Sequence, residues 1–304
     1  MKASFFRRYG GPEVLEYGKL PDPVPAAGEV LVEIHAASIN AADWKMRSGS
    51  YGLNIPLPHV PGRDFSGVIV KGGDYFKPGD LVYGVCEVPR EGAYAEKIAI
   101  REAIVGRKPE KLSHVQTAAI ALIGLTALIS VEETLKLKRG ETILVQGGAG
   151  GVAGFAIALA KHIGARVITT ASASNHDYVR KLGADEAIDY KAQDFTKVVK
   201  NVDAVFDTVG GDVTQKSFAV LKAGGRLASI AGGGTAPPSP RSDVTSLRPK
   251  VDRDRPHLDR VAKLVSDGTI PLPEIKEYPL ANAADAHRVS EARHLRGKLV
   301  LRVR

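Results

Sequence analysis

Polar and apolar residues alternate over much of the first hundred residues. The clearest case is 29–36, where the alternation has the two-residue period of a strand with one solvated face. Segments 65–70 and 81–85 are further apolar strands, and glycine and proline interrupt the region about every ten residues. This pattern predicts a compact β-rich barrel or sandwich.

The pattern changes near Leu112. Ser113 is a suitable N-cap for an apolar helix over 114–129. From Glu141 onward, short apolar strands alternate with helical periods, and Gly164 ends the helix that begins near Val152. Strands are predicted over 142–145, 166–170, 187–190, 203–207 and 226–230. Such alternation predicts a parallel sheet with helices on both faces.

Residues 232–250 form the least regular stretch, with three successive glycines and four prolines. A long loop of this kind is either functional or a connection between domains, and the sequence leaves both open. After it, 258–265 is predicted as a helix and 298–303 as a final strand.

Composition narrows the class of protein. Hydrophobic residues make up 44% of the chain, which excludes wholesale disorder, and the single cysteine, Cys86, excludes a disulfide framework. No targeting segment and no membrane span are expected, since the longest apolar run, 118–131, is short, so we expect a cytoplasmic protein. The net charge of +8 indicates a solvated basic surface or an anionic partner such as a phosphorylated cofactor.

A glycine-rich segment follows the predicted strand 142–145. Residues 148–153 read Gly-Ala-Gly-Gly-Val-Ala, the G-x-G-x-x-A pattern between a strand and an apolar helix. Gly150 would let the backbone approach a pyrophosphate, whose charge the helix N-terminus favours. A purely structural glycine turn is the alternative.

The next strand bears on the choice of dinucleotide. An NAD site typically has a carboxylate about 20 residues after the glycines, which binds the ribose 2′-hydroxyl. Residues 169–175 contain only hydroxyl side chains, alanines and an amide. His176, Arg180 and Lys181 follow closely, and such groups favour a 2′-phosphate. We therefore expect NADP rather than NAD, unless Ser174 or Asn175 merely caps the helix.

Metal and serine chemistry have no support in the sequence. The histidines form no H-E-x-x-H or H-x-x-E-H group, Cys86 has no cysteine partner, and no G-x-S-x-G elbow occurs.

Several motifs, in order along nearly the whole chain, resemble one known family. They are Tyr9-Gly10-Gly11-Pro12-Glu13-Val14-Leu15, Ala36-Ala37-Ser38-Ile39-Asn40-Ala41-Ala42-Asp43-Trp44-Lys45, Pro61-Gly62-Arg63-Asp64-Phe65-Ser66-Gly67, Gly92-Ala93-Tyr94-Ala95-Glu96, Gly124-Leu125-Thr126-Ala127, the glycine loop, Leu182-Gly183-Ala184-Asp185, Asp207-Thr208-Val209-Gly210-Gly211 and Arg296-Gly297-Lys298. The chain resembles the zinc-independent, zeta-crystallin-like quinone oxidoreductase branch of the medium-chain dehydrogenase/reductase superfamily. The match is weakest over 232–250.

The resemblance implies an α/β protein with two domains. A GroES-like domain would comprise 1–118 and 256–304, and a Rossmann domain 119–255. It implies NADPH as hydride donor, a quinone or α,β-unsaturated carbonyl as acceptor, a cleft between the domains, and a homodimer in which 226–230 and the following loop supply the interface. Zinc-dependent relatives place a cysteine near Asn40 and a His-Glu pair at Arg63-Asp64, and neither is present.

The resemblance also assigns residues. Ala149, Gly150, Gly151 and Val152 match the pyrophosphate loop, and Ser172 and Tyr190 match positions that hold the 2′-phosphate; Asn175 joins them by its place in the sequence. Thr126 matches a threonine beside the nicotinamide, and Asn40 and Tyr51 match the substrate cleft. A proton for the acceptor would come from Tyr51, Asn40, Lys45 or water. The alternatives are that Asn40 caps a turn, Tyr51 is a surface aromatic and Tyr190 packs on the sheet.

Two rival functions remain open. One is an enoyl-thioester reductase on the same scaffold, for which Tyr51 is the only candidate acid. The other is an NADPH-sensing or RNA-binding protein without activity, although no RNP1 motif is present and nucleic-acid binding is not favoured.

Overall fold

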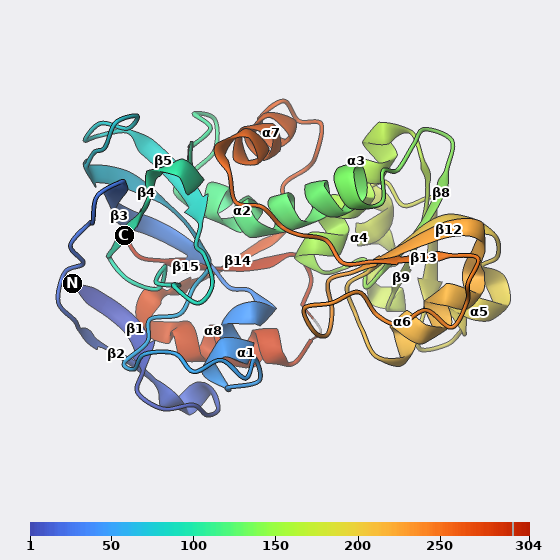
Figure 1. The fold of residues 1–304 in the computed structure, drawn as a ribbon, viewed down its shortest axis with the longest axis horizontal. Helices are drawn as coiled ribbons and strands as arrows, with labels where there is room; N and C mark the ends of the chain where they lie inside the picture. Colours follow the sequence, from blue (N-terminus) through green and yellow to red (C-terminus); the bar gives the residue numbers. More distant parts are fainter. Residues whose placement is uncertain (294) are drawn as a thin grey trace. The chain divides into compact units, whose positions relative to one another are not determined.

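The computed structural model describes residues 1–293 and 295–304 and divides into two compact units. Unit 1 comprises 1–122, 253–266 and 274–304, and unit 2 comprises 123–252 and 267–273. Each unit has its own large sheet (Figure 1). The expected fold class, a β-rich domain together with a parallel sheet flanked by helices, is confirmed.

Unit 1 is built on a seven-stranded sheet in the order β14-β15-β3-β4-β5-β7, with β6 also pairing with β3. A separate two-stranded sheet joins β1 and β2. The strands are β1 Lys2–Phe6, β2 Leu15–Lys19, β3 Glu29–Ser38, β4 Asp64–Lys71, β5 Leu81–Val85, β6 Lys97–Arg101, β7 Val105–Arg107, β14 Ile275–Pro279 and β15 Lys298–Arg302. Strand β15 pairs antiparallel with β3, with Leu301 opposite Ala37, so segments more than 250 residues apart in the sequence lie side by side in one sheet.

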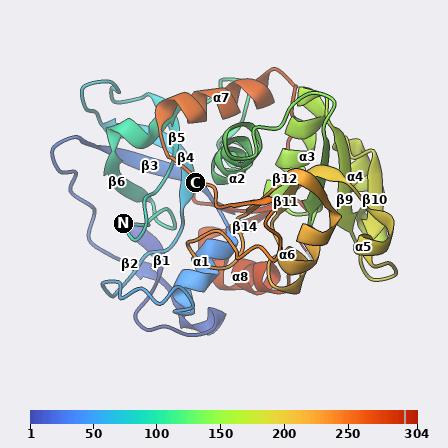
Figure 2. The same ribbon diagram turned by 45° about the vertical axis from the view of Figure 1, so that its right-hand side comes forward.

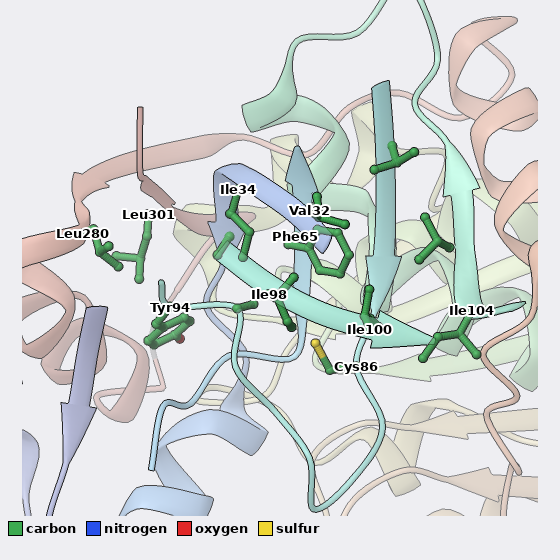
Figure 3. Close-up of a cluster of buried hydrophobic side chains, with 14 of the residues drawn as sticks. Val32, Ile34, Phe65, Cys86, Tyr94, Ile98, Ile100, Ile104, Leu280 and Leu301 are labelled. Carbon is green, nitrogen blue, oxygen red and sulfur yellow. The ribbon is translucent and has the colours of Figure 1, made fainter. Parts of the chain in front are cut away.

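The predicted alternation of β3 places its apolar residues in the core of unit 1. Val32 and Ile34, two residues apart, are both fully buried, as the two-residue period requires. Figure 3 shows them in one cluster with Phe65, Ile98 and other apolar side chains from neighbouring strands. The strands that bear these core residues also carry polar residues at their ends, such as Ser38 of β3 and Asp64 of β4.

Helices and short turns complete unit 1. The helices are α1 Ala41–Arg47, α7 Arg255–Ser266 and α8 Ala283–Glu291, and the 3-10 turns are Pro12–Val14, Glu102–Ile104 and Leu280–Asn282. Helix α2, His114–Leu128, begins in unit 1 and ends in unit 2. Ser113 caps it as predicted, because the Ser113 hydroxyl accepts the Gln116 amide at 3.1 Å and the Gln116 side chain accepts the Ser113 amide at 2.9 Å.

Unit 2 contains a six-stranded, wholly parallel sheet in the order β10-β9-β8-β11-β12-β13. Its elements are β8 Thr142–Gln146, α3 Gly151–Ile163, β9 Arg166–Ala171, α4 His176–Lys181, β10 Glu186–Asp189, α5 Phe195–Val198, β11 Val202–Asp207, α6 Asp212–Ser217, β12 Leu221–Ser229 and β13 Thr245–Leu247, with 3-10 turns at Ala173–Asn175 and Phe218–Val220. Figure 2 shows its strands side by side with the helices beside them. Successive strand residues such as Ile143 and Leu144 are both fully buried, so both faces of the sheet are covered, as predicted.

The stretch 232–250 is more ordered than its composition indicates. It contains β13, a strand that the sequence analysis missed, which continues the sheet in parallel register with β12. The Arg241 guanidinium donates to the carbonyls of Phe218 and Leu221 at 2.9 and 2.7 Å, and Arg248 donates to those of Ser229 and Ala231. Two arginines therefore hold this stretch against the sheet, and β13, not β12, is the edge strand at this end of the sheet.

Helix α2 continues through a wider π-type turn, Ile129–Thr134. Together they span 21 residues, which is long and apolar enough to cross a membrane by length and composition, but 78% of the apolar window is buried inside the protein. A largely buried helix of this kind is typical of a protein core.

Candidate active site

The glycine turn of unit 2 lies between β8 and α3. Gly147 has a φ of +78°, a left-handed conformation that favours glycine, and its amide donates to the Thr170 hydroxyl at 3.1 Å. A Cβ on Gly148 would lie 2.2 Å from Oγ1 of Thr169, so a side chain there would clash with β9. The sequence analysis missed Gly147, although the glycine pair after the strand was a visible signal.

The predicted pyrophosphate residues come together at the start of α3. Gly150 is the N-cap of the helix, Ala149 precedes it, and Gly151 and Val152 form its first turn. First-turn amides have no carbonyl one turn earlier, so they can donate to an anion. A Cβ on Gly150 would meet only the Gly147 carbonyl oxygen, at 3.4 Å, which leaves open space for a ligand in front of this backbone.

The predicted 2′-phosphate residues follow the ends of two neighbouring strands. Asp189 of β10 pairs with Ala171 of β9, so Tyr190 and Ser172 come directly after paired residues at the carboxyl edge of the sheet. The Asn175 amide donates to the Ser172 hydroxyl at 3.1 Å, and the Tyr190 side chain is half-exposed, one residue beyond the end of β10.

The charged groups near this edge are largely turned toward other partners. The carboxylate of Asp189 accepts the Lys191 amide at 3.0 Å, within its own turn. Arg180 lies 3.5 Å from Asp177 on the surface of α4, and the His176 ring contacts the Ala171 carbonyl at 3.3 Å. With its glycine turn, free helix start and hydroxyl-rich edge, unit 2 has the residues that fit a nicotinamide dinucleotide.

The predicted substrate residue Asn40 is part of a buried network in unit 1. Asp64 Oδ1 accepts the Ser38 hydroxyl at 2.7 Å and the Asn40 amide at 2.9 Å, and its Oδ2 accepts the backbone amide of Leu122 at 3.1 Å. Lys298 Nζ donates to Asn40 Oδ1 at 2.8 Å and to the backbone carbonyl of Ile39 at 2.7 Å. Burial raises the pKa of Asp64 and lowers that of Lys298. The charge of each residue partly offsets the pKa shift of the other. Both ends of the Asn40 amide are therefore engaged within the protein.

A second buried chain runs through Asp43. The Tyr94 hydroxyl and the Asn40 backbone amide both donate to Asp43 Oδ2 at 2.8 Å. Tyr94 is in turn 3.2 Å from His287 Nε2, and His287 Nδ1 is 3.1 Å from an Arg47 nitrogen. An arginine can only donate, so Nδ1 accepts, Nε2 carries the imidazole proton, and the donors run in one direction from Arg47 to Asp43.

The charge states of this chain follow from its burial. Burial and, to a smaller extent, the Arg47 charge together lower the pKa of His287 to about 3, so the ring stays neutral. Burial raises the pKa of Asp43 to about 8, and the Glu91 carboxylate raises it as well. Asp43 is therefore mainly a neutral carboxylic acid at pH 7, and its Oδ1 has no hydrogen-bond partner among the described residues.

Tyr51 lies beside a third group of charges. Its ring is 5.1 Å from the guanidinium carbon of Arg63 and its side chain is partly exposed. Arg63 Nε donates to Glu91 Oε1 at 2.7 Å, and Glu91 Oε2 lies 3.4 Å from His59. Tyr51 therefore differs from Asn40, because its hydroxyl belongs to a residue on the surface of unit 1.

The remaining predicted residues are placed as follows. Thr126 is buried on the part of α2 that belongs to unit 2, and its carbonyl accepts the Ser130 hydroxyl at 2.6 Å. The ammonium of Lys45 lies 5.6 Å from the Trp44 ring. Cys86 is buried, and burial raises the pKa of its thiol. The roles proposed for these residues stay predictions.

The sequence analysis did not single out the charged members of unit 1's networks. Asp43, Glu91 and Lys298 were given no role, and Arg63 was noted only because it stands where zinc-dependent relatives have a His-Glu pair. Within 1–293 and 295–304, no cluster of three or more His, Cys, Asp or Glu residues has the arrangement of a metal site.

Comparisons with known proteins agree with this arrangement. The family model of the alcohol dehydrogenase GroES-like domain matches residues 26–121, and that of zinc-binding dehydrogenases matches 182–301. A chloroplastic NADPH-dependent alkenal/one oxidoreductase of Arabidopsis thaliana is 35% identical over 99% of this chain and 79% of its own length. A 2-methylene-furan-3-one reductase of Solanum lycopersicum is 37% identical over 85% of this chain and 69% of its own.

Solved structures are similar over the whole chain. The quinone oxidoreductase from Coxiella burnetii has a TM-score of 0.92 at 35% identity, covering 100% of this chain and 99% of that one. The Escherichia coli quinone oxidoreductase complexed with NADPH has a TM-score of 0.91 at 28% identity, covering 100% of both chains.

Proposed function

Because this chain belongs to the quinone oxidoreductase branch of the medium-chain dehydrogenase/reductase superfamily, we propose that it oxidises NADPH and reduces quinones or α,β-unsaturated carbonyls. The observation that carries the proposal is the edge of unit 2, where a glycine turn and helix start lie next to hydroxyl and amide donors. The relatives described as NADPH-dependent and as complexed with NADPH support the choice of cofactor. A homodimer and a cytoplasmic location stay predictions.

NADPH, when bound, supplies the hydride. The amides of Gly151 and Val152 are assigned to the pyrophosphate, and Ser172, Asn175 and Tyr190 to the 2′-phosphate. Hydroxyl and amide donors suit a phosphate dianion, whereas a carboxylate at the same place would repel it. These residues bind and orient the cofactor and take no part in the chemistry.

The acceptor needs a hydrogen-bond donor for the oxygen on which charge collects. We assign this role to the Tyr51 hydroxyl. We treat Asn40 as a positioning residue, because Asp64 and Lys298 already occupy its amide. Asn40 is the N-cap of α1, and its backbone amide donates to Asp43, so it fixes the start of the segment that carries Tyr51.

The test is NADPH oxidation with a panel of quinones and enones. We expect Tyr51→Phe to lower kcat on enones more than on quinones, because a quinone is already strongly electrophilic. The loss should be at most about a hundred- to a thousandfold, the scale of one stabilising donor. Tyr17→Phe, which removes a hydroxyl from the exposed strand β2 of the same unit, is the matched control and should change neither rate.

Three outcomes would contradict the proposal. Turnover only with enoyl thioesters would favour the enoyl-thioester reductase, and NADPH binding without turnover, together with RNA binding, would favour the sensor. Dialysis against a chelator should leave the activity unchanged, whereas a stoichiometric zinc signal whose removal abolishes activity would show a metal-dependent reaction.

A further inference from the structure

Two buried arginines of unit 1 use their guanidinium groups differently. Arg47 is saturated: its Nε donates to the Gly10 carbonyl at 3.2 Å, one terminal nitrogen lies 3.1 Å from His287, and the other pairs with Glu291. An arginine with every nitrogen partnered is a structural cross-link.

Arg63 is not saturated. Its Nε is fixed by Glu91, but its Nη2 is buried and has no hydrogen-bond partner among the described residues. An unmet donor on a buried cation is costly. Burial lowers the pKa of Arg63, but the charges and the hydrogen bond of its neighbours, Glu91 first among them, together raise it above its ordinary value, so the side chain stays a cation. The position of Arg63 therefore needs an explanation beyond stability.

The backbone around Arg63 is held firmly. Gly62 has a φ of +104°, and a Cβ there would lie 2.3 Å from the Tyr94 ring, so only glycine fits at this position. The Arg63 carbonyl accepts the Cys86 amide, and Glu91 is fully buried. The guanidinium is thus a fixed positive charge rather than a mobile surface group.

Tyr51 is the group that this charge faces. The guanidinium carbon lies 5.1 Å from the Tyr51 ring centroid, within the range of a cation–π contact. Tyr51 is 40% exposed, whereas the side chain of Arg63 is only 10% exposed. The pair therefore joins a buried charge to a phenol that solvent and ligands can reach.

We propose that Arg63, held by Glu91, stabilises the negative charge that Tyr51 acquires when it protonates a reduced enone. This inference rests on the proposed function. The β carbon of the enone gains a hydride from NADPH, and the electron pair moves to the carbonyl oxygen. The Tyr51 O–H bond then breaks to give that oxygen its proton, and the phenolate takes a proton back from water.

Arg63 acts through Tyr51, so it is a positioning residue rather than a catalytic one. The proposal predicts an effect on turnover and little effect on acceptor KM, because the charge on Tyr51 forms only during the reaction. It also predicts a larger effect for enones than for quinones, which depend less on a donor.

The experiment compares two variants with a matched control. Arg63→Met combined with Glu91→Gln removes the charged pair without leaving a lone buried carboxylate. We expect it to lower kcat on an enone about ten- to a hundredfold and on a quinone less than about threefold. Arg63→Lys keeps the charge but not the planar group, and should restore most of the enone rate. Arg101→Met with Glu87→Gln makes the same change in a largely exposed pair and should change neither rate.

A readout without cofactor or substrate accompanies the kinetics. The ring NMR resonances of Tyr51, assigned by their loss in Tyr51→Phe, should move in both Arg63 variants and stay fixed in the Arg101 control. If the neutral double variant does not fold, Arg63→Gln, which removes the charge but keeps an N–H donor for Glu91, is compared in the wild-type and Tyr51→Phe backgrounds. It should lower the enone kcat in the wild-type background and cause no further loss in the Tyr51→Phe background, because the two residues act together.

The results separate this inference from the proposed function. Wild-type protein that reduces neither acceptor overturns the function. Wild-type protein that reduces both, with a folded neutral variant that keeps its enone kcat, overturns the role of Arg63 alone. Equal losses on enone and quinone, or unmoved Tyr51 resonances, overturn it as well.

Discussion

The polar residues buried in unit 1 and those at the exposed edge of unit 2 are in opposite situations. Asp64, Asn40 and Lys298 satisfy one another inside unit 1. At the edge of unit 2, Ser172 and Tyr190 are partly exposed hydroxyl residues that follow paired strand ends. Burial with complete pairing marks a structural network, whereas donors with free capacity at the carboxyl ends of parallel strands mark a ligand site.

Removing one charge from the buried network should give the largest effect. Lys298→Met removes the positive charge that offsets the buried Asp64, and it leaves Asn40 Oδ1 without a hydrogen-bond donor. Breaking a buried pair costs about 3–5 kcal/mol. Urea unfolding should report a loss of that size in the free energy of unfolding.

The matched control for Lys298 is a surface pair of unit 2. Lys161→Met breaks the bridge to Asp185, in which both side chains are a third to a half exposed. We expect a loss of at most about 1 kcal/mol. Equal losses for the two lysine variants would show that the buried network is not what stabilises unit 1.

Changing the exposed edge should affect binding instead of stability. Ser172→Asp with Tyr190→Phe replaces a donor by a carboxylate and removes a second donor. Each charge-assisted hydrogen bond is worth roughly 1.5–3 kcal/mol, so the Kd of NADPH should rise about tenfold or more while that of NADH changes little. Fluorescence titration of both cofactors measures this, with NADH as the internal control. Wild-type protein that binds both cofactors equally, or a variant that loses both alike, would place the 2′-phosphate elsewhere.

A smaller effect is expected from the pH dependence of Asp43. Its pKa is about 8 in the folded protein, against an ordinary value of 3.8, so folding takes up a proton between these pH values. The stability from this group is complete below about pH 4 and is lost as the pH rises through about 8. Asp43→Asn mimics the neutral acid and can still accept from Tyr94 and Asn40.

The free energy of unfolding of Asp43→Asn relative to wild type should therefore increase by about 1 kcal/mol or more from about pH 5 to about pH 9. Urea unfolding at the two pH values gives the difference. Asp177→Asn, at a position 92% exposed, should show no such gain. A relative stability that is the same at both pH values would mean that Asp43 is already ionised at about pH 5 in the folded protein.

The sequence predicted what depends on near neighbours. The strand before Gly148, the helix after it and the end of that helix at Gly164 all follow from local periodicity and from glycine's backbone freedom. The family resemblance led to Asn40 and Tyr51, but their surroundings were not predictable. Lys298 meets Asn40 across 258 residues of sequence, and only the pairing of β15 with β3 brings them together.

The sequence also failed where an element is too short to have a period. Strand β13 has three residues in a stretch rich in glycine and proline, and its position is fixed by the neighbouring β12 and by Arg241 and Arg248. Arg63 directly precedes β4, whereas Tyr51 lies in the loop after α1. No rule of sequence spacing predicts a contact between the two residues.

The position of β15 in the sheet determines when unit 1 can complete its folding during synthesis. This strand lies between β14 and β3 within the sheet, and its first residue, Lys298, completes the network of Asp64 and Asn40. A ribosome must therefore pass residue 302 before unit 1 can close its sheet, while every strand of unit 2 has already been synthesised. During translation, residues 36–38 of β3 stay unpaired on one side until β15 has been made, which is the interval in which chaperones would matter most.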